Sequence, residues 1–364
     1  MTSRLLFTIS SLFIVAALIG CGSSGTKMIP QTAMAGPFTF VANNNLSTIS
    51  TFQVDPSSGQ LSMVGSTPTD ACSGPRYLEL HPSKAFLFVS CQNSNSVATF
   101  SVDRSSGSLM MIGSPVPAGT GPITVAVDPQ GKFLYVSNIN SNTISAFSIG
   151  SDGTLMPIPG SPFATGQTPY WVEMSSSGNF VYTANRDSNN VSAFRVDPAS
   201  GILTEIPGSP FAADKGPRAI ALSGKFAFVP NRFANTVSAF MVDPNTGALT
   251  PVAGSPFATH TDPRSAATDS TGRFLYVPNT VSNDISAYTI DSNSGALTPM
   301  SGSPFPGGQV PLQIETDSAG KFIYVANSGS NNVSVYAVNS TTGQLQLVQT
   351  TTTPGSAVSF AQVQ

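Results

Sequence analysis

The sequence contains few charged residues. Only 9% of its 364 residues are Asp, Glu, Lys or Arg, whereas average globular proteins have about 25%. The net charge is −3, and no run of basic residues occurs. Because nucleic-acid binding depends on concentrated positive charge, we exclude nucleic acid as a partner.

Cysteine, histidine and tryptophan are also rare, with three, two and one copies. The chain has no CxxC or HExxH pair, no EF-hand loop, no phosphate-cradling glycine loop and no GxSxG elbow. These absences exclude the common zinc, calcium, nucleotide and serine-hydrolase sites, and we expect no cofactor. A sustained helical period is also missing after residue 37, which favours an all-β fold.

The N-terminus is predicted to be a targeting segment. One arginine precedes an apolar run from Leu5 to Ile19, which is short for a membrane span and typical of a secretory signal. The following "LIGC" resembles the lipobox of bacterial lipoproteins. This resemblance implies a signal peptide over 1–20, lipidation of Cys21 and a flexible tether over 21–36. An ordinary signal peptide with an unrelated cysteine is the alternative.

The predicted location is the cell envelope, at the periplasmic face or the outer membrane, with the lipid on Cys21 as the contact with the membrane. If Cys21 carries lipid, Cys72 and Cys91 remain as an even pair in an oxidising compartment. A bridge between them would close a loop of about 20 residues and stabilise the fold by roughly 3 kcal/mol. Two free buried thiols are the alternative.

The chain after Pro37 is a repeat. An aromatic residue, two small or aliphatic residues and asparagine recur as FVAN, YVSN, YTAN, FVPN, YVPN and YVAN, with FVSC in the second copy. The last residues of these seven copies lie 46 to 48 positions apart, at Asn43, Cys91, Asn138, Asn185, Asn231, Asn279 and Asn327. Such a constant period predicts seven equivalent structural units.

Each unit contains four segments typical of strands. In the unit over residues 123–163 these are ITVAVDP, KFLYVSN, the alternating TISAFSI, and LMPIPGSPF, where proline predicts a sheet edge. Four antiparallel strands in about 47 residues are typical of a β-propeller blade. The sequence therefore predicts a seven-bladed β-propeller over 37–364.

The two ends of this region predict how the ring closes. The first copy begins directly at FTFVANN without the strand that precedes it elsewhere, and GSAVSFAQVQ follows the last copy as an extra strand. We expect this C-terminal strand to complete the first blade, which would remove free sheet edges. The tetrapeptide GSPF, present four times, is interpreted as a turn after the outer strand that starts the crossing to the next blade.

The motifs FLYVSN…SNTISAF, FLYVPN…SNDISAY and FIYVAN…SNNVSVY resemble the lactonase-like β-propeller family. This family includes bacterial 6-phosphogluconolactonase-type propellers, a fungal muconolactone-forming enzyme and YVTN repeat proteins of cell surfaces. The resemblance covers all seven repeats and implies the propeller fold and chemistry on lactones. Enzymatic members carry Pro-His at the start of an innermost strand, whereas the matching prolines here precede Arg, Ile, Tyr or Leu.

Residues at the starts of the innermost strands are the candidates for ligand binding. Arg76, Arg218, Arg264 and Tyr170 each follow the matching proline, and Trp171 stands beside Tyr170. Arg186 and Arg232 follow motif asparagines on the same predicted face. Arginine pairs suit a carboxylate or phosphate because the guanidinium can donate two parallel hydrogen bonds.

Three carboxylates recur at a second offset. Glu79, Glu173 and Glu315 each lie four residues after the proline, and alternation gives them a common direction. They could hold a divalent cation, pair with the arginines or act as a base, or they could simply be solvated in a water-filled channel. In a lactonase, Arg218 and Arg264 would bind the acid group, and His260 or Glu173 would be the base.

Three functions remain open at this point. The first is a tethered propeller that binds a small anionic ligand, a glycan or a protein of the envelope at the channel mouth. The second is a lactonase, a carboxylic-ester hydrolase acting on a sugar lactone, so whether the chain is an enzyme stays undecided. The third is a surface scaffold without a ligand.

Overall fold

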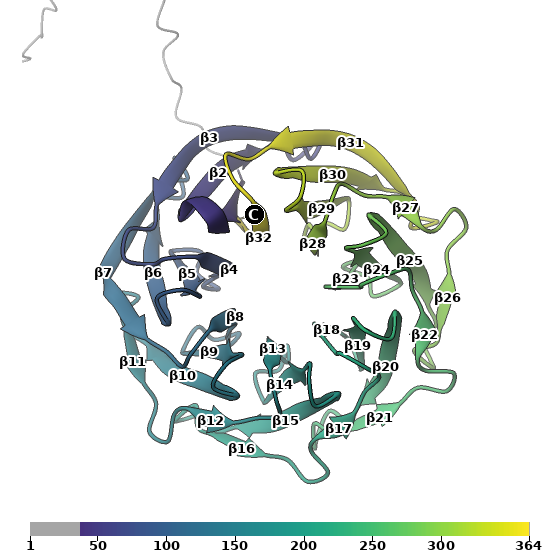
Figure 1. Cartoon of the computed structure of the whole chain (residues 1–364), viewed down its shortest axis with the longest axis horizontal. Coiled ribbons are helices and arrows are strands. Elements are labelled where there is room, and N and C mark those ends of the chain that lie inside the picture. The colour runs from purple at the N-terminus through teal and green to yellow at the C-terminus, as the bar shows by residue number, and fades with distance from the viewer. Residues whose placement is uncertain (1–36, 364) are drawn as a thin grey trace, which may run out of the picture. The chain divides into compact units, whose positions relative to one another are not determined.

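A computed structural model describes residues 37–363 as a closed ring of seven antiparallel sheets (Figure 1). The predicted signal segment, the tether and Cys21 lie outside the described residues. Blade 1 combines β32 with β1 to β3, and blades 2 to 7 follow in chain order. The seven-bladed, all-β prediction is confirmed. The described residues include one short 3-10 helix, η1 (Asn44–Leu46), and no helix there is long and apolar enough to span a bilayer.

Four concentric layers of strands build the ring, and their bounds are as follows. The innermost strands are β32 (Ala357–Val363), β4 (Pro75–Leu80), β8 (Pro122–Val127), β13 (Pro169–Met174), β18 (Ala221–Ser223), β23 (Ala267–Thr268) and β28 (Pro311–Thr316). The second strands are β1 (Phe38–Asn43), β5 (Phe86–Cys91), β9 (Phe133–Asn138), β14 (Phe180–Asn185), β19 (Phe226–Asn231), β24 (Phe274–Asn279) and β29 (Phe322–Asn327).

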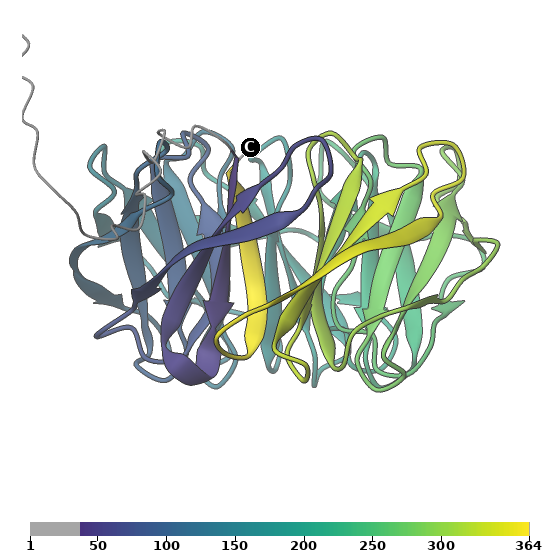
Figure 2. The same ribbon diagram turned by 90° about the horizontal axis from the view of Figure 1, so that it is seen from above.

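The two outer layers complete the blades. The third strands are β2 (Thr48–Val54), β6 (Ser96–Val102), β10 (Thr143–Ile149), β15 (Asn190–Val196), β20 (Thr236–Val242), β25 (Asp284–Ile290) and β30 (Asn332–Val338). The outer strands of blades 1, 2 and 7 are continuous: β3 (Leu61–Pro68), β7 (Leu109–Pro117) and β31 (Leu345–Thr352). Seen from the side, the strands stand next to one another between the two faces of a disc (Figure 2).

Ring closure occurs as the sequence predicts. Strand β32 pairs antiparallel with β1, so that Phe40 lies opposite Ala361. The phenyl ring of Phe360 is buried with Val41 and Phe52 in one hydrophobic cluster. Blade 1 is thus built from both ends of the propeller region, and the closing contact combines ladder hydrogen bonds with core packing.

The GSPF copies lie inside the outer strands, which corrects their predicted place in the crossing between blades. They divide the outer strands of blades 3 to 6 into the pairs β11 (Leu155–Pro157) and β12 (Phe163–Ala164), β16 (Leu203–Glu205) and β17 (Phe211–Ala212), β21 (Leu249–Pro251) and β22 (Phe257–Ala258), and β26 (Leu297–Pro299) and β27 (Phe305–Pro306). In blade 3 the amide of Ala146 donates a 2.9 Å hydrogen bond to the Ser161 hydroxyl, and Phe163 then pairs with Ile144. The motif is therefore a local excursion of an edge strand, where the missing N–H of proline is tolerated.

Neighbouring blades contact one another through an aromatic side chain and a glycine. The Tyr135 hydroxyl on β9 donates a 2.9 Å hydrogen bond to the carbonyl of Gly201, in the outer hairpin of the next blade. Gly201 has φ of +72°, and a Cβ there would stand 2.6 Å from the Phe133 ring. Tyr182, Tyr276 and Tyr324 make the equivalent bond to a glycine of the following blade. The FxY pattern of the second strand therefore stabilises the contact between blades.

The motif asparagines connect the second and third strands of their own blades. Asn138 is fully buried, and its amide group donates a 3.0 Å hydrogen bond to Ser145, seven residues later. The same bond occurs from Asn43, Asn185, Asn231, Asn279 and Asn327. Blade 2 lacks both partners of this bond, because Cys91 stands in place of the asparagine and Ala98 in place of the serine.

A disulfide replaces the missing asparagine contact of blade 2. Cys91 is bonded to Cys72, three residues before Pro75. The matching position in blades 3, 4 and 7 is a glycine, and a Cβ on Gly119 would lie 2.6 Å from the Asn138 side chain. The cysteine pair thus links covalently the two chain segments that touch through glycine and asparagine in those blades.

This equivalence predicts how blade 2 responds to substitution. Cys91→Ser should lower the free energy of unfolding by about 2–4 kcal/mol, because it removes the bridge without restoring the asparagine contact. The combined variant Cys72→Gly, Cys91→Asn, Ala98→Ser should recover at least half of that loss. Urea unfolding with and without a reducing agent measures both, and the wild type should respond to reduction whereas the combined variant should not. A combined variant no more stable than Cys91→Ser would contradict the equivalence.

Candidate functional site

A bulge opens the innermost strands toward the channel. Between β4 and β5 the pairing passes from Pro75 with Cys91 to Leu78 with Val89, so Arg76 and Tyr77 together face one residue of β5. The amide of Tyr77 donates to the Ser90 hydroxyl at 3.0 Å instead of to the ladder. Similar register shifts start β8, β13 and β28. Because a bulge re-aims side chains, two consecutive residues per strand reach the channel instead of one.

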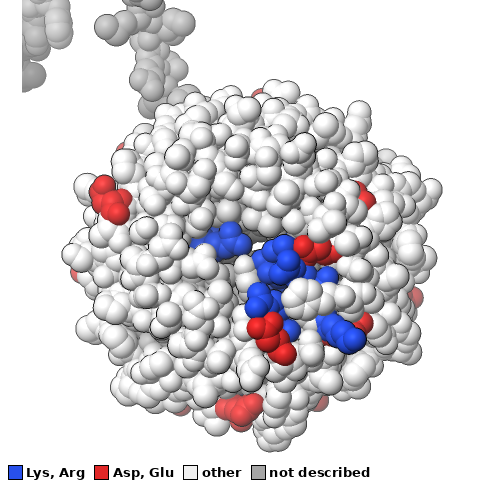
Figure 3. All heavy atoms as spheres, viewed as in Figure 1, with Lys and Arg blue, Asp and Glu red and all other residues white. Residues whose placement is uncertain are grey.

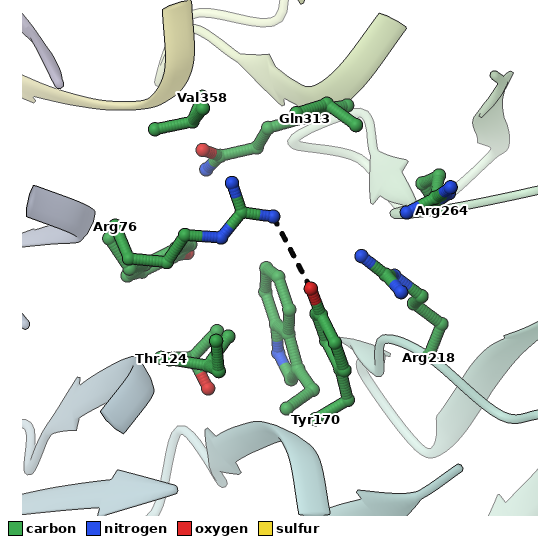
Figure 4. A pocket seen from close by; sticks show the side chains of 11 residues that line it. Arg76, Thr124, Tyr170, Arg218, Arg264, Gln313 and Val358 are labelled. Atoms are coloured by element: carbon green, nitrogen blue, oxygen red, sulfur yellow. Dashed lines mark hydrogen bonds between the residues drawn. The ribbon is translucent and has the colours of Figure 1, made fainter. Parts of the chain in front are cut away.

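These bulges line a small cavity at one mouth of the channel. The consecutive pairs from four blades are Arg76 with Tyr77, Ile123 with Thr124, Tyr170 with Trp171, and Leu312 with Gln313. Arg218, Arg264 and Val358 complete the lining. Figure 4 shows Arg76, Arg218 and Arg264 entering from different blades toward the Tyr170 hydroxyl. In Figure 3 the basic side chains gather around this central opening, while most of the same face is uncharged.

Arg218 is the most unusual residue of this cavity, because its side chain is charged and only 4% exposed. No acidic side chain pairs with it among residues 37–363. Burial lowers the pKa of its guanidinium well below the usual value, Arg264 and Arg76 lower it further, and Tyr170 opposes them. Since a guanidinium keeps its proton in proteins, the result is a buried positive charge that an anion would stabilise.

Arg264 differs from Arg218 because it has an acidic partner. Its guanidinium donates two hydrogen bonds to Asp262, at 2.9 and 2.8 Å. Arg232 donates to the same carboxylate at 2.9 Å. Asp262 therefore holds two arginines in place and leaves the positive charge of the cluster in excess.

Tyr170 is in contact with two of the arginines. The Arg218 guanidinium carbon lies 3.5 Å from the centre of its ring, and an Arg76 nitrogen donates to its hydroxyl at 3.3 Å. Burial alone would raise the pKa of Tyr170, but the positive charges of Arg218 and Arg76 lower it to about 7. Arg186 is less close, at 5.9 Å from the ring centre, and pairs with Asp187 at 2.7 Å.

The glutamates form a second layer deeper in the channel. Trp171 donates a 2.8 Å hydrogen bond to Glu173, and Gln313 donates one of the same length to Glu315. Burial raises the pKa of Glu173 to about 7, and burial with the nearby Glu173 charge raises that of Glu315 to about 8. The pKa of Glu79 is also raised, by burial and by both other glutamates.

The negative charges of the glutamates thus raise the pKa values of Glu79 and Glu315, although the three residues do not form a metal cluster. Among residues 37–363 no three His, Cys, Asp or Glu side chains lie close enough to share a metal ion. Glu79 and Glu315 border a hollow in the channel together with His81 and Lys84. His81 contacts the carbonyl of Gly131 at 2.9 Å, in the turn of the next blade.

His260 is not brought to the arginine cavity. Its ring nitrogen lies 2.7 Å from Asp284, and half of its side chain is exposed. It does not line the cavity beside Arg218. The structure therefore brings Arg76, Arg218, Arg264, Tyr170 and Trp171 together, places Glu173 below them, and leaves His260 outside.

Proline residues on the second strands explain the positions of Arg218 and Arg264. Pro230 and Pro278 lack the N–H that would bond the innermost strand, and β18 and β23 begin only after this point. The amides of Arg218 and Arg264 donate instead to the carbonyls of these prolines, at 2.9 and 3.1 Å. The FVPN and YVPN variants of the repeat are thus a signal in the sequence for these open strand starts.

The fold and its polar channel define a seven-bladed propeller with an arginine-lined mouth. The family model of the seven-bladed β-propeller lactonases matches residues 31–125, 118–210, 205–308 and 304–361. The chain therefore belongs to the lactonase family of seven-bladed β-propellers. A search of curated proteins finds no sequence match to the chain.

Solved structures share the fold at low sequence identity. A provisionally assigned 6-phosphogluconolactonase from Bacteroides uniformis is 23% identical, with a TM-score of 0.81 over 90% of this chain and 100% of that one. The periplasmic gluconolactonase of Pseudomonas aeruginosa is 21% identical, with a TM-score of 0.79 over 90% and 99% of the two chains. At these identities the similarity establishes the fold alone.

The raised pKa values of the glutamates predict a dependence of stability on pH. A carboxyl whose pKa is higher in the folded than in the unfolded state stabilises the fold below the unfolded value, about 4.3, and this stabilisation is lost as pH rises through the folded value. The free energy of unfolding should therefore fall between about pH 4.3 and 8, by at most about 1.4 kcal/mol per pH unit for each carboxyl. Glu173→Gln and Glu315→Gln should each flatten this decline.

The fourth glutamate of the chain provides the control. Glu205 lies on the outer strand β16 and is exposed, so Glu205→Gln makes the same chemical change away from the channel. Urea unfolding at a series of pH values compares the three variants. A wild-type stability that rises over this range, or an equal effect of Glu205→Gln, would contradict the assignment.

Proposed function

We propose that the arginine-lined mouth binds a small organic anion through its carboxylate or phosphate group. The observation that carries this proposal is Arg218, a buried guanidinium without an acidic partner among the described residues. Arg76 and Arg264 add two further donors from other blades. Three guanidinium groups around one opening can surround a planar or tetrahedral anion with charge-assisted hydrogen bonds.

The rest of the lining suits a compact polar ligand. Tyr77 and Trp171 stand edge to face at 5.1 Å between their ring centres. Thr124 and Gln313 add hydroxyl and amide groups to the same wall. A sugar acid combines the features that this cavity would recognise: one carboxylate for the arginines, and hydroxyls with an apolar ring or chain face for the remaining groups.

Hydrolysis of a sugar lactone is the second candidate function. Membership of the lactonase family supports it, as do the names of the two similar structures. Ester hydrolysis needs a base for the attacking water and donors for the developing oxyanion. Glu173 would supply the base, and Arg218 or Arg264 the donors. Opening a lactone produces a carboxylate, so a product complex would use the same arginines.

We also propose that the protein acts in the cell envelope, held to a membrane by lipid on Cys21. The support is the apolar segment followed by LIGC in the sequence, together with the Cys72–Cys91 disulfide, because structural disulfides persist in oxidising compartments. Labelling with a radioactive fatty acid in a bacterial host, with Cys21→Ser as the control, tests the anchor.

Gluconate should bind the purified chain, and Arg218→Ala should weaken that binding about 10- to 100-fold, because a hydrogen bond to a charged group contributes about 1.5–3 kcal/mol. At about pH 6, where Tyr170 keeps its proton because its pKa is about 7, the melting temperature of Arg218→Ala should not fall, since the substitution removes a buried charge that lacks an acidic partner. Titration calorimetry with gluconate and with inorganic phosphate measures the affinity. Arg195→Ala, on the outer part of blade 4, is the matched control and should bind normally.

Unchanged affinity in Arg218→Ala, or no binding of either anion by the wild type, would contradict this function. The same preparations decide on the second candidate when they are given sugar lactones and acid release is followed. Turnover that Arg218→Ala and Glu173→Gln both abolish would establish a lactonase. Gluconate binding without turnover would favour a binding protein.

A further inference from the structure

Two tyrosines line the arginine cavity in opposite electrostatic surroundings. Tyr77 and Trp171 lie edge to face, and burial together with the charges of Glu79 and Glu315 raises the pKa of the Tyr77 phenol. Tyr170 contacts Arg218 through its ring and Arg76 through its hydroxyl. The surroundings of Tyr77 therefore favour its neutral phenol, whereas those of Tyr170 favour the ionised phenolate.

The charged side chains that act most strongly on Tyr170 are cationic. Arg76 reaches it from β4, Arg218 from the segment before β18, and Arg264 from the segment before β23. Arg186 reaches the ring from the loop after β14. Glu173 lies three residues after Tyr170 on β13, where the Trp171 indole donates a hydrogen bond to one of its carboxylate oxygens.

Acidic groups are too few to balance these arginines. Asp262 is shared by Arg232 and Arg264, and Asp187 is bound to Arg186. The cavity lining itself contains no Asp or Glu. The phenol of Tyr170 is therefore the one acidic group of the lining that could supply a negative charge to Arg76 and Arg218, and it would do so by releasing its proton.

We propose that Tyr170, as a phenolate, is the resident anion of this cluster, and that a ligand anion takes its place at the arginines while Tyr170 takes up one proton from the solvent. This inference rests on the proposed function, because it concerns the same anion site. It adds a regulation that the proposed function does not contain: the site would exchange an internal anion for an external one, and protons would control the exchange.

The direction of the pH dependence follows from this exchange. The free protein has a Tyr170 pKa of about 7, and a ligand that neutralises the arginines raises this pKa back toward the ordinary value near 10. The ligand then binds most tightly where Tyr170 is already protonated. Its affinity should be constant below about pH 6 and should fall by up to tenfold per pH unit above about pH 7.

An absorbance titration of the free protein tests the first half of the proposal. The near-ultraviolet absorbance of tyrosinate should rise in a step centred near pH 7, corresponding to one phenol. This step should be absent in Tyr170→Phe and present in Tyr77→Phe, which removes the other phenol of the cavity. A wild type without a tyrosinate step below about pH 9 would overturn the proposal.

Calorimetry with gluconate tests the second half. Gluconate is a suitable probe because its carboxyl, with a pKa of about 4, stays ionised throughout the range from about pH 6 to 9. Titrations at about pH 8, in two buffers of different ionisation enthalpy, should show uptake of close to one proton per gluconate by the wild type and none by Tyr170→Phe. Glu173→Gln should keep the uptake, which excludes the neighbouring carboxyl as the acceptor.

The two experiments separate the proposals. Gluconate binding without proton uptake, or equal uptake in Tyr170→Phe, would overturn the exchange and leave anion binding intact. A wild type whose tyrosinate step is present but which binds neither gluconate nor inorganic phosphate would overturn the proposed function and the exchange with it. Loss of both the step and the proton uptake in Tyr170→Phe alone would support the inference.

Discussion

The site depends on asparagine side chains that hold five of the channel-entering loops from the preceding blade. The side-chain oxygen Oδ1 of Asn189 accepts a 2.9 Å hydrogen bond from the backbone amide of Gly216, two residues before Arg218. Asn235 accepts the same bond from Asp262, two residues before Arg264. Five asparagines make this contact, namely Asn95, Asn142, Asn189, Asn235 and Asn283. All five have positive φ, between 51° and 59°, which asparagine tolerates better than most residues.

Because these bonds use only the backbone of the loop they hold, the side chains beyond it are free to vary. The residue after the proline that starts six of the innermost segments is arginine in three blades and isoleucine, tyrosine or leucine in the other three. One scaffold can thus present an asymmetric set of groups from nearly identical repeats. The fold is set by the repeat, whereas the chemistry is set by the few positions where the repeats differ.

The sequence predicted the repeat, the four strands per blade, the closing strand and the all-β class, because these follow from hydrophobic periodicity and from the spacing of the motifs. It could not predict the bulge at Arg76 and Tyr77, since a register shift depends on the hydrogen bonds of two strands together. The sequence also could not predict that the three glutamates approach one another, because strand alternation gives the direction of a side chain but not its distance from side chains across the channel. The position of His260, three residues before Pro263, predicted that it would join the arginines. Its side chain instead contacts Asp284. Pro230 and Pro278 were visible signals of the open strand starts, and reading them requires knowing which side of the second strand faces the channel.

The channel keeps its positive and negative layers apart through two adjacent residues of one strand. Tyr170 faces the arginines, and Trp171 donates to Glu173 below. If the Glu173 carboxylate reached Arg218 directly, the two would form a buried ion pair and the anion site would be filled by the protein itself. With the indole on Glu173, and with burial raising the pKa of that carboxyl to about 7, the glutamate is a weak competitor for the arginines at neutral pH. The bulge that brings both aromatic side chains into the channel therefore does more than widen the lining, because it leaves Arg218 without a carboxylate partner, as the proposed anion site requires.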